Sequence, residues 1–409
     1  MRYPLSSQQS ISPEAVEAAV TVLRSGKFTM GAQVAQFEHD FAKWVGSKHA
    51  VMVNSDSSAN LLAIEALVKP SPRIPIREGW GPGCEVLVPA LAWSTTVMPL
   101  IQRGLVPVFV DIDEDTLAMD LNHAEYMYSH QCVGLMLIHV LGLAAPHLLA
   151  LQGLCEQRRM TLIEDCCEAF RAFSYGQSVG TMGLMGTFSH FFSHQLTTME
   201  GGTIVTDDDD IADDLRSMRA HGWTRERKDR VRWNAEGMPD PSFCFVTTGY
   251  NVRPLEVQGA MGVVQLAHAE QGLMERSQTA FEMVEVLKTG APYLKVVGSQ
   301  YAGDSLASLR SRKNRRHSWM NLPILVTDDA PFTRDQVVQR FNQAGIETRP
   351  IIAGNLLRHP VMPSMNVRRA REYPVADKVM RQGFMMGCHP DPGGVEALYD
   401  ACRALKVAA

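Results

Sequence analysis

Short apolar runs alternate with segments of helical periodicity over the first half of the chain. An apolar run bounded by turn residues is typical of a buried strand, whereas apolar residues three and four positions apart are typical of a helix. Strands are predicted at 49–53, 85–90, 107–112, 134–140 and 161–166, and helices at 12–23, 33–45, from about 95 and at 146–158. This alternation predicts an α/β fold with a mostly parallel, mixed sheet flanked by helices, which the segments 183–192 and 201–205 would close.

A second, smaller unit is predicted after the sheet. A helix is expected to begin within 249–266 and to continue to about 287. Further strands and helices are predicted at 318–326, 333–344, 346–350 and 395–405. This pattern predicts a large domain over 1–262 and a small α+β C-terminal domain over 263–409, which includes the linking helix.

The composition is that of an ordinary globular chain. It has 409 residues, 45% of them hydrophobic, which is enough for two domains with substantial cores. Its 39 basic and 44 acidic residues are mixed along the sequence and give a net charge of -5, so neither nucleic acid nor a membrane surface is an expected partner. The start of the chain lacks a secretory signal pattern, and no run of about 18 apolar residues occurs. We therefore expect a cytoplasmic protein with a small ligand.

Two polar segments that follow predicted strands contain candidate chemistry. The first, NSDSSANL, follows the strand at 49–53 and opens a helix, with Ser57 and Ser58 at the helix start. A strand, a turn and a helix N-terminus form an arrangement that binds phosphate, although helix capping alone would also explain two adjacent serines. The second segment, SHFFSHQLTTMEGG, covers 189–202 and contains His194.

These segments belong to a series of motifs that resembles a known family in order and spacing. The motifs are NSDSSANL, VPALAWSTT, PVFVDID, IEDCCEA, FSHFFSHQLTTMEGG, RAHGWTR, GYNVRP, HSWMNLPI and GIETRPIIAGNL, and the resemblance covers about 28–355. They resemble the DegT/DnrJ/EryC1/StrS family of sugar aminotransferases and dehydratases. The resemblance implies the fold-type-I aminotransferase architecture, with a large domain that binds pyridoxal 5'-phosphate (PLP) or pyridoxamine 5'-phosphate (PMP). It also implies a homodimer whose active site is shared between the subunits.

His194 occupies the position at which the aminotransferases of this family have a lysine. A lysine amine can hold PLP as a Schiff base, whereas an imidazole cannot hold it covalently and can only move protons. Glu168 is a second difference, because the aminotransferases commonly have glutamine there and the dehydratases have glutamate. The resemblance therefore implies a PMP-dependent 3-dehydratase of a nucleotide-linked 4-keto-6-deoxyhexose, in deoxysugar biosynthesis. His194 would serve as its base and acid at an ordinary pKa of about 6.5, with Glu168 orienting it or sharing its proton.

The cofactor residues follow from the same resemblance. Asp165 would pair with the protonated pyridine nitrogen, and Trp93 would stack on the ring. The phosphate donors would be Ser57, Ser58, Ser189 and, from the partner subunit, Asn251. Asp56 departs from the family, which usually has glycine there. Because a phosphate dianion repels a carboxylate, Asp56 must point away from the phosphate, or the phosphate site is rearranged.

A nucleotide sugar and L-glutamate, which would regenerate PMP, are the expected ligands besides the cofactor. The glutamate carboxylate requires a cation, for which Arg225, Arg253 and Arg349 are candidates. The other candidate substrate residues are Phe28, His221 and His317. The basic loop over 310–316 would either contact the substrate diphosphate or be solvated. The eight cysteines lack the spacing of a cluster or metal site, so neither an iron-sulfur cluster nor a metal is expected.

Three other functions remain open from the sequence. The chain could be a nucleotide-sugar aminotransferase that works without the lysine. It could be a dehydratase that acts on a nucleoside-linked sugar of an antibiotic pathway. It could also be a non-catalytic scaffold of the same fold, for which Asp56 is the strongest argument.

Overall fold

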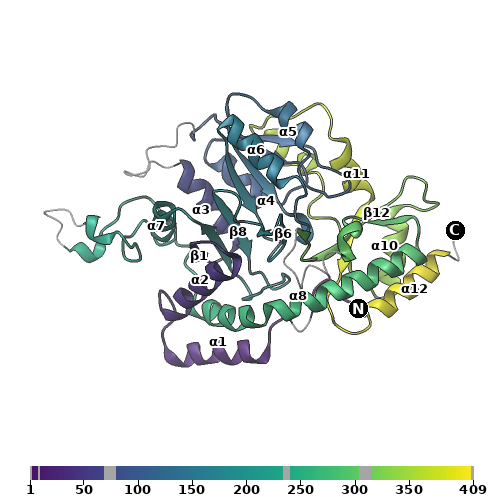
Figure 1. The fold of residues 1–409 in the computed structure, drawn as a ribbon, viewed down its shortest axis with the longest axis horizontal. Helices are drawn as coiled ribbons and strands as arrows, with labels where there is room; N and C mark the ends of the chain where they lie inside the picture. The colour runs from purple at the N-terminus through teal and green to yellow at the C-terminus, as the bar shows by residue number, and fades with distance from the viewer. Residues whose placement is uncertain (1, 8–9, 69–79, 234–239, 304–314, 407–409) are drawn as a thin grey trace.

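A seven-stranded sheet forms the centre of the computed structural model, which describes residues 2–7, 10–68, 80–233, 240–303 and 315–406 (Figure 1). In order across the sheet, the strands are β1 (His49–Val53), β9 (Gly202–Thr206), β8 (Met185–Ser189), β5 (Thr161–Asp165), β4 (Cys132–Ile138), β2 (Glu85–Pro89) and β3 (Val106–Val110). Pairing is parallel from β8 to β3, whereas β9 is antiparallel to both of its neighbours. The predicted mostly parallel, mixed sheet is confirmed.

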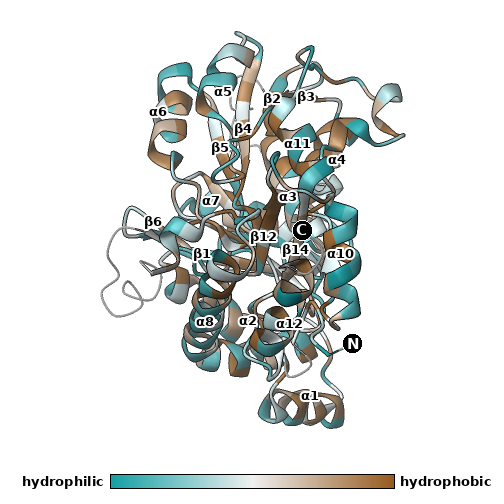
Figure 2. Ribbon diagram, turned by 90° about the vertical axis from the view of Figure 1, so that its right-hand side faces the viewer, coloured by the Kyte–Doolittle hydropathy of each residue, from teal (hydrophilic) through white to brown (hydrophobic). Residues whose placement is uncertain are grey.

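Both faces of this sheet are buried, which explains why its strands are continuous apolar runs rather than alternating ones. In β1, Val51 and Val53 belong to one hydrophobic cluster, and Ala50 and Met52 to the other. The covering helices are α2 (Ala32–Val45), α3 (Asp56–Val68), α4 (Ser94–Gln102), α5 (Leu121–Met127), α6 (Leu148–Arg158) and α7 (Asp209–Met218). The strands are accordingly among the most apolar segments of the molecule (Figure 2).

The long helix α8 (Glu256–Gly290) connects the two parts of the chain. It packs against α1 (Pro13–Ser25) and α2 near its start and against α12 (Gly394–Lys406) near its end (Figure 1). With 35 residues it is about 50 Å long. The expected domain boundary at residue 262 lies within its first turns, so this division of the chain stays a prediction. Although α8 is long, no helix in the described part of the chain has the apolar stretch needed to cross a bilayer.

A smaller antiparallel sheet follows α8. Its strands, in order, are β10 (Leu294–Val296), β12 (Asn321–Val326), β14 (Gly383–Gly387) and β13 (Thr348–Arg349), accompanied by α10 (Arg334–Gln343), α11 (Pro374–Gln382) and α12. A third sheet consists of β6 (Phe173–Ser174), β7 (Gln177–Ser178) and β11 (Arg315–Arg316). Short 3-10 helices lie at Val140–Gly142, Arg230–Trp233, Pro241–Phe243, Ser299–Tyr301, Leu356–Arg358 and Met362–Ser364. Of the basic loop expected at 310–316, only β11 lies within the described residues.

Candidate functional site

A cavity of about 440 Å³ lies at the carboxyl-terminal edge of the large sheet. β5 ends there at Asp165, and the parallel β8 ends there at Ser189. β1 runs in the same direction and leads through Ser55 into α3, so all three strands deliver polar residues to one edge. The volume of the cavity is typical of a small-ligand site. The predicted site residues that line it are Asp56, Ser57, Trp93, Asp165, Glu168, Ser189 and His194.

Asp165 is the most firmly held side chain of the cavity. Its Oδ2 accepts hydrogen bonds from Asn60 Nδ2 (3.0 Å) and Thr96 Oγ1 (2.8 Å), and its Oδ1 accepts one from the Cys167 amide (3.1 Å). Asn60 is itself oriented by Thr187, whose Oγ1 donates to Asn60 Oδ1 at 2.8 Å. Donors from three elements therefore fix one orientation of a buried carboxylate, as a partner for a cationic ring nitrogen requires.

The first turn of α3 forms another wall of the cavity. Ser55 Oγ accepts a hydrogen bond from the Ser58 amide (3.2 Å), and Ser58 Oγ donates to Asn54 Oδ1 (2.7 Å). Ser57 lines the cavity, whereas the Ser58 hydroxyl is used within the turn. Asp56 lies close to Asp165, with one carboxylate oxygen of each residue within 4.8 Å of the other. The carboxylate of Asp56 thus lies in the cavity wall near Asp165, and the way in which the site accommodates both Asp56 and a phosphate stays a prediction.

Gly202, the second residue after Glu200, lies against the backbone of Ser55 and Asp56, where only glycine fits. A Cβ atom at this position would lie 2.4 Å from the carbonyl carbon of Ser55 and 2.6 Å from the Asp56 amide nitrogen. Contacts this short with backbone cannot be relieved by a side-chain rotation. The glycine therefore allows β9 to pass directly against the turn that opens α3.

Replacing Gly202 with alanine is expected to displace this turn and weaken anion binding at α3. Overpacking of this kind costs about 1–3 kcal/mol, which corresponds to roughly a tenfold or larger loss of cofactor retention if the strain is released at the turn. Equilibrium dialysis with PMP measures the loss. Gly272→Ala is the matched control, because its Cβ would meet nothing within 4 Å in the exposed middle of α8 and should stabilise the helix by about 1 kcal/mol. Equal PMP binding by the two variants would contradict this role of Gly202.

His194 lies in the loop between β8 and β9, half-buried in the cavity wall. Its Nδ1 is buried and has no hydrogen-bond partner among the described residues. Burial, with a smaller contribution from the charge of Arg276, lowers the pKa of the imidazole to about 4. The ring is therefore neutral at pH 7, unlike the freely titrating imidazole expected from the sequence. An anionic phosphate in the cavity would raise this pKa again, because a nearby negative charge favours the imidazolium.

Glu168 has the opposite behaviour. Burial raises its pKa to about 7; the Leu141 amide, which donates to its Oε2 at 2.7 Å, opposes this shift, and the Asp165 charge adds to it. Glu168 and His194 line the same cavity, but the described contacts include no hydrogen bond between them. The site thus combines a neutral imidazole with a carboxyl group that keeps its proton up to about pH 7, and such a pair can divide base and acid roles.

Three large apolar side chains, Trp93, Ile352 and Met385, line the cavity. Trp93 precedes α4 and is 55% exposed, so one face of its ring is available to a flat ligand. Ile352 and Met385 line the cavity from the part of the chain that contains the small sheet. Ile352 has a φ of 48°, which is strained for a β-branched residue and is found mostly at functional sites.

Comparison with known proteins assigns this fold and cavity to a family. Residues 9–397 match the model of the DegT/DnrJ/EryC1/StrS aminotransferase family. The chain belongs to this family. It is 37% identical over 396 residues to GDP-4-keto-6-deoxy-D-mannose 3-dehydratase of Yersinia pseudotuberculosis, covering 95% of this chain and 94% of the relative. The enzyme of the same name from Escherichia coli O55:H7 is 38% identical over 394 residues, covering 95% and 96%.

A solved structure of a family member agrees with this assignment. GDP-4-keto-6-deoxymannose-3-dehydratase with a trapped PLP-glutamate geminal diamine superposes with a TM-score of 0.88 at 35% identity, covering 98% of this chain and 100% of that chain. The family resemblance and the aminotransferase architecture inferred from the sequence motifs are confirmed.

Several residues predicted from the family motifs do not line the cavity of the single chain. Asn251 and His221 are exposed and lie together, since the His221 amide donates to the Tyr250 carbonyl (2.8 Å) and Asn251 bridges to Ala220. Arg225 lies over the Trp223 ring, with 5.2 Å from Cζ to the ring centre. These residues are not part of the cavity lining.

The remaining predicted substrate residues lie in three different places. Phe28 is 49% exposed, and Arg253 is near it, with Nη1 3.9 Å from Met30 Sδ. Arg349 is exposed and paired with Glu347 (3.0 Å). His317 is buried, and its Nδ1 accepts a hydrogen bond from the Ala144 amide at 3.0 Å, which is a structural contact. None of these side chains is placed against Asp165 or His194 by the described contacts.

The sequence reasoning missed the residues that hold Asp165. Asn60 and Thr96 are both buried and polar, and each lies among apolar residues on the buried face of its helix. Such an isolated polar residue on a buried helix face requires a partner, and this was the available signal. No comparable pattern marks Ile352 or Met385, because their approach to the cavity depends on the tertiary fold.

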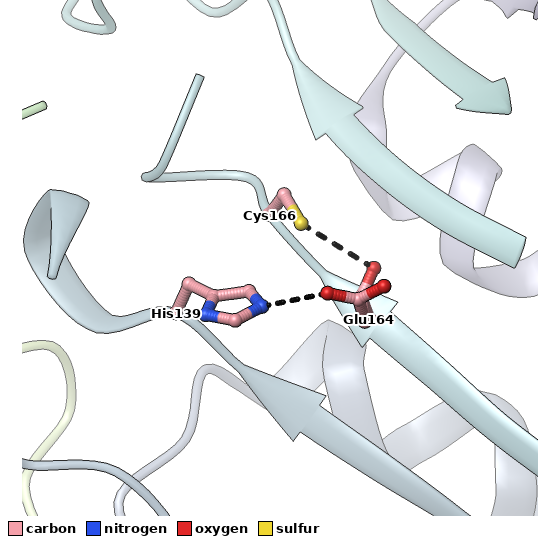
Figure 3. A group of neighbouring side chains, drawn as sticks. All are labelled: His139, Glu164 and Cys166. Carbon is pink, nitrogen blue, oxygen red and sulfur yellow. Dashed lines mark hydrogen bonds and ion pairs between the residues drawn. The ribbon is translucent and has the colours of Figure 1, made fainter. Parts of the chain in front are cut away.

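A second polar cluster, outside the cavity, is structural. His139, Glu164 and Cys166 lie together behind β5 (Figure 3). His139 Nε2 is 3.0 Å from Glu164 Oε2, and its Nδ1 accepts from an amide, so the ring is neutral and donates to Glu164. Glu164 also accepts from the amides of Gly180, Met182 and Gly183. Although burial acts against it, His139 and these amides lower the pKa of Glu164. Both ring nitrogens of His139 and both carboxylate oxygens of Glu164 are thus already used in hydrogen bonds within the protein.

Proposed function

We propose that this protein is a PMP-dependent 3-dehydratase of a nucleotide-linked 4-keto-6-deoxyhexose, and that GDP-4-keto-6-deoxymannose is its substrate. The observation that carries the proposal is the cavity lining: among the described residues, it includes Asp165 but no lysine or arginine, and His194 is its basic side chain. Curated relatives of 37% and 38% identity that bear this activity in their names support it.

The residues of the cavity fit the cofactor. Asp165 offers a fixed carboxylate for the ring nitrogen, and Trp93 offers an exposed aromatic face. Ser57 and Ser189, with the amides at the start of α3, supply phosphate donors. When bound, the cofactor supplies an amine that condenses with the sugar ketone and a ring that accepts electrons from the adjacent carbon.

His194 moves the proton in this proposal. Its neutral imidazole, which lines the cavity, would accept the proton that leaves the carbon next to the cofactor amine. The resulting imidazolium returns that proton to the 3-hydroxyl of the sugar, which departs as water. Glu168 stays protonated up to about pH 7, so it does not add its own negative charge to that of Asp165 in the cavity. Because an imidazole cannot bind the cofactor covalently, the amine remains available to the sugar.

The product decides between this function and its alternatives. The purified protein should be incubated with PMP, L-glutamate and a panel of nucleotide-linked 4-ketosugars, and the sugars weighed by mass spectrometry. Loss of the 3-oxygen supports the dehydratase, and the responding substrate identifies the nucleotide. Gain of an amine would instead make the protein an aminotransferase, and no conversion together with no PMP binding would favour a scaffold.

We also propose that L-glutamate regenerates PMP and that the active site is completed in a homodimer. The trapped PLP-glutamate compound of the related enzyme supports the first proposal. The second is supported by the exposed position of Asn251, His221 and Arg225 and the half-buried position of Arg253, all outside the lining of the chain's own cavity. Sedimentation equilibrium of the purified protein tests the assembly, and a monomer at working concentration would contradict it.

Changing Glu168 to glutamine is expected to flatten the pH dependence of apoprotein stability. The folded state keeps the Glu168 proton up to about pH 7, whereas the unfolded chain loses it near the ordinary value of 4.5. The folded state therefore binds more protons in this window, and stability falls as pH rises through it. Glutamine removes that contribution. The melting temperature of the Glu168→Gln variant, relative to that of wild type, should therefore rise as the pH increases from about 5 to about 7. Thermal melts measure this, with the exposed Glu156→Gln as control; parallel curves for Glu168→Gln and wild type would exclude the shifted carboxyl group.

A further inference from the structure

Asp56 is a carboxyl group of the cavity that the proposed mechanism does not use. It lies in the first turn of α3. One of its carboxylate oxygens lies within 4.8 Å of a carboxylate oxygen of Asp165 and of the Cys167 Sγ. One amide group connects the two carboxylates: Asn60 Nδ2 is 3.0 Å from Asp165 Oδ2 and 3.4 Å from Asp56 Oδ2. The other oxygen of Asp56, Oδ1, is buried without a hydrogen-bond partner among the described residues.

Two ionised carboxylates are not stable in this place. The titratable groups that face Asp56 are Asp165, Cys167 and Glu168 from the end of β5, with His194 and Glu200 elsewhere in the lining. None of them is a cation at neutral pH in the described structure, and no lysine or arginine lines the cavity there. Burial first, and then the charges of Asp165 and Glu168, raise the pKa of Asp56 well above its usual range. A single proton on the pair removes this repulsion.

We propose that Asp56 and Asp165 form a proton-sharing carboxyl pair that holds one proton in the apoprotein and releases it when the cationic ring of the cofactor binds. The ring nitrogen arrives as N–H⁺ and pairs with Asp165. Its charge favours the ionised form of Asp56, whereas the cofactor phosphate at the start of α3 opposes it. In this proposal the ring has the larger effect, because it pairs with the carboxylate that shares the Asn60 amide with Asp56. The O–H bond of Asp56 then breaks, and its proton leaves to the solvent. Asp56 is thus a positioning residue that acts through Asp165, and it makes cofactor retention depend on pH. The inference rests on the proposed cofactor.

The carboxyl pair determines how many protons are released when PMP binds. If one proton is released per site, the affinity for PMP rises about tenfold for each pH unit until the pair ionises in the apoprotein. Below that pH, each molecule of PMP must displace a proton. Because Asn60 already holds Asp165 in place, removal of the Asp56 proton should not remove the binding site itself.

Calorimetric titration of the apoprotein with PMP in buffers of different ionisation enthalpy tests the proposal. Wild type should release close to one more proton per site than Asp56→Asn, which keeps the shape but cannot ionise. The pH dependence of PMP affinity should flatten in the same variant. Asp56→Gly, the residue usual in the family, should behave like Asp56→Asn, and Glu168→Gln separates any proton contributed by Glu168.

The outcomes separate this inference from the proposed function. Equal proton release by wild type and Asp56→Asn, with PMP bound by both, overturns the carboxyl pair and leaves the cofactor assignment intact. Absence of PMP binding by wild type overturns the cofactor assignment and the inference with it. Tight Zn²⁺ binding by the apoprotein that is lost in Asp56→Asn would also overturn the inference, because the pair would then be a set of metal ligands with Cys167.

Discussion

Replacing His194 with lysine is expected to abolish 3-dehydration and to attach the cofactor covalently to the protein. Loss of a positioned acid and base reduces the rate by about 100- to 10,000-fold. The half-buried position of His194 should lower the pKa of the new amine, which keeps it partly neutral and nucleophilic. Visible absorbance with PLP and fixation by borohydride, followed by mass spectrometry of the labelled peptide, measure the attachment.

A matched control separates this effect from a gain of one lysine. His39 is an exposed histidine of α2, outside the lining of the cavity, so His39→Lys gives the same composition without a cofactor contact. It should leave dehydration unchanged and remain unlabelled. Full dehydration by the His194→Lys protein would remove His194 from the proton transfer, and the proposed mechanism with it.

Asp165→Asn is expected to lose the cofactor without losing the fold. The amide oxygen can replace only one carboxylate oxygen, so its NH2 group would face either the Cys167 amide or the donors Asn60 and Thr96. A neutral amide also lacks the charge that a pyridinium ring needs, and hydrogen bonds to charged groups contribute about 1.5–3 kcal/mol. PMP retention should therefore fall roughly 10- to 100-fold, and turnover at saturating PMP about 100-fold.

The neighbouring residue provides the control for this variant. Glu164→Gln changes the adjacent buried carboxylate, which accepts from His139 and from the amides of Gly180, Met182 and Gly183 on the other face of β5 (Figure 3). It should lower the melting temperature of the apoprotein while the folded protein still retains PMP. Asp165→Asn should instead lose PMP while the melting temperature of the apoprotein changes little. If both variants mainly unfold, Asp165 is a structural residue and its proposed role falls.

The sequence predicts the large sheet well because its strands are buried on both faces. The apolar runs that contain β1, β5 and β9 stand out for that reason, and Asp165 and Ser189 follow from them as strand ends at one edge. β14 is missed, although it lies in the middle of the small sheet. Its sequence, GFMMG, is flanked by glycines and lacks β-branched residues, so local propensity gives no strand signal there.

The chemistry of the site was less predictable than its position. The motifs identify His194, Glu168 and Asp165, but the pKa values of the first two depend on burial and on charges brought in by folding. For the same reason the sequence leaves open whether Asp56 points away from the phosphate or the phosphate site is rearranged. The surface position of Asn251 and the burial of His317 depend on tertiary contacts that no local pattern encodes.

The contacts of Glu164 also determine which carboxylate reaches the cavity. Successive residues of a strand point to opposite faces, so a slip of β5 by one residue relative to its neighbours would exchange Glu164 and Asp165. The amides of Gly180, Met182 and Gly183 and the ring of His139 all bond to the Glu164 carboxylate, and a slip would break these four contacts, so they favour the present register of β5. A buried contact on the far face of the sheet thus selects the acid that faces the ligand, and the chemistry of the cavity depends on strand alignment as much as on the residues that line it.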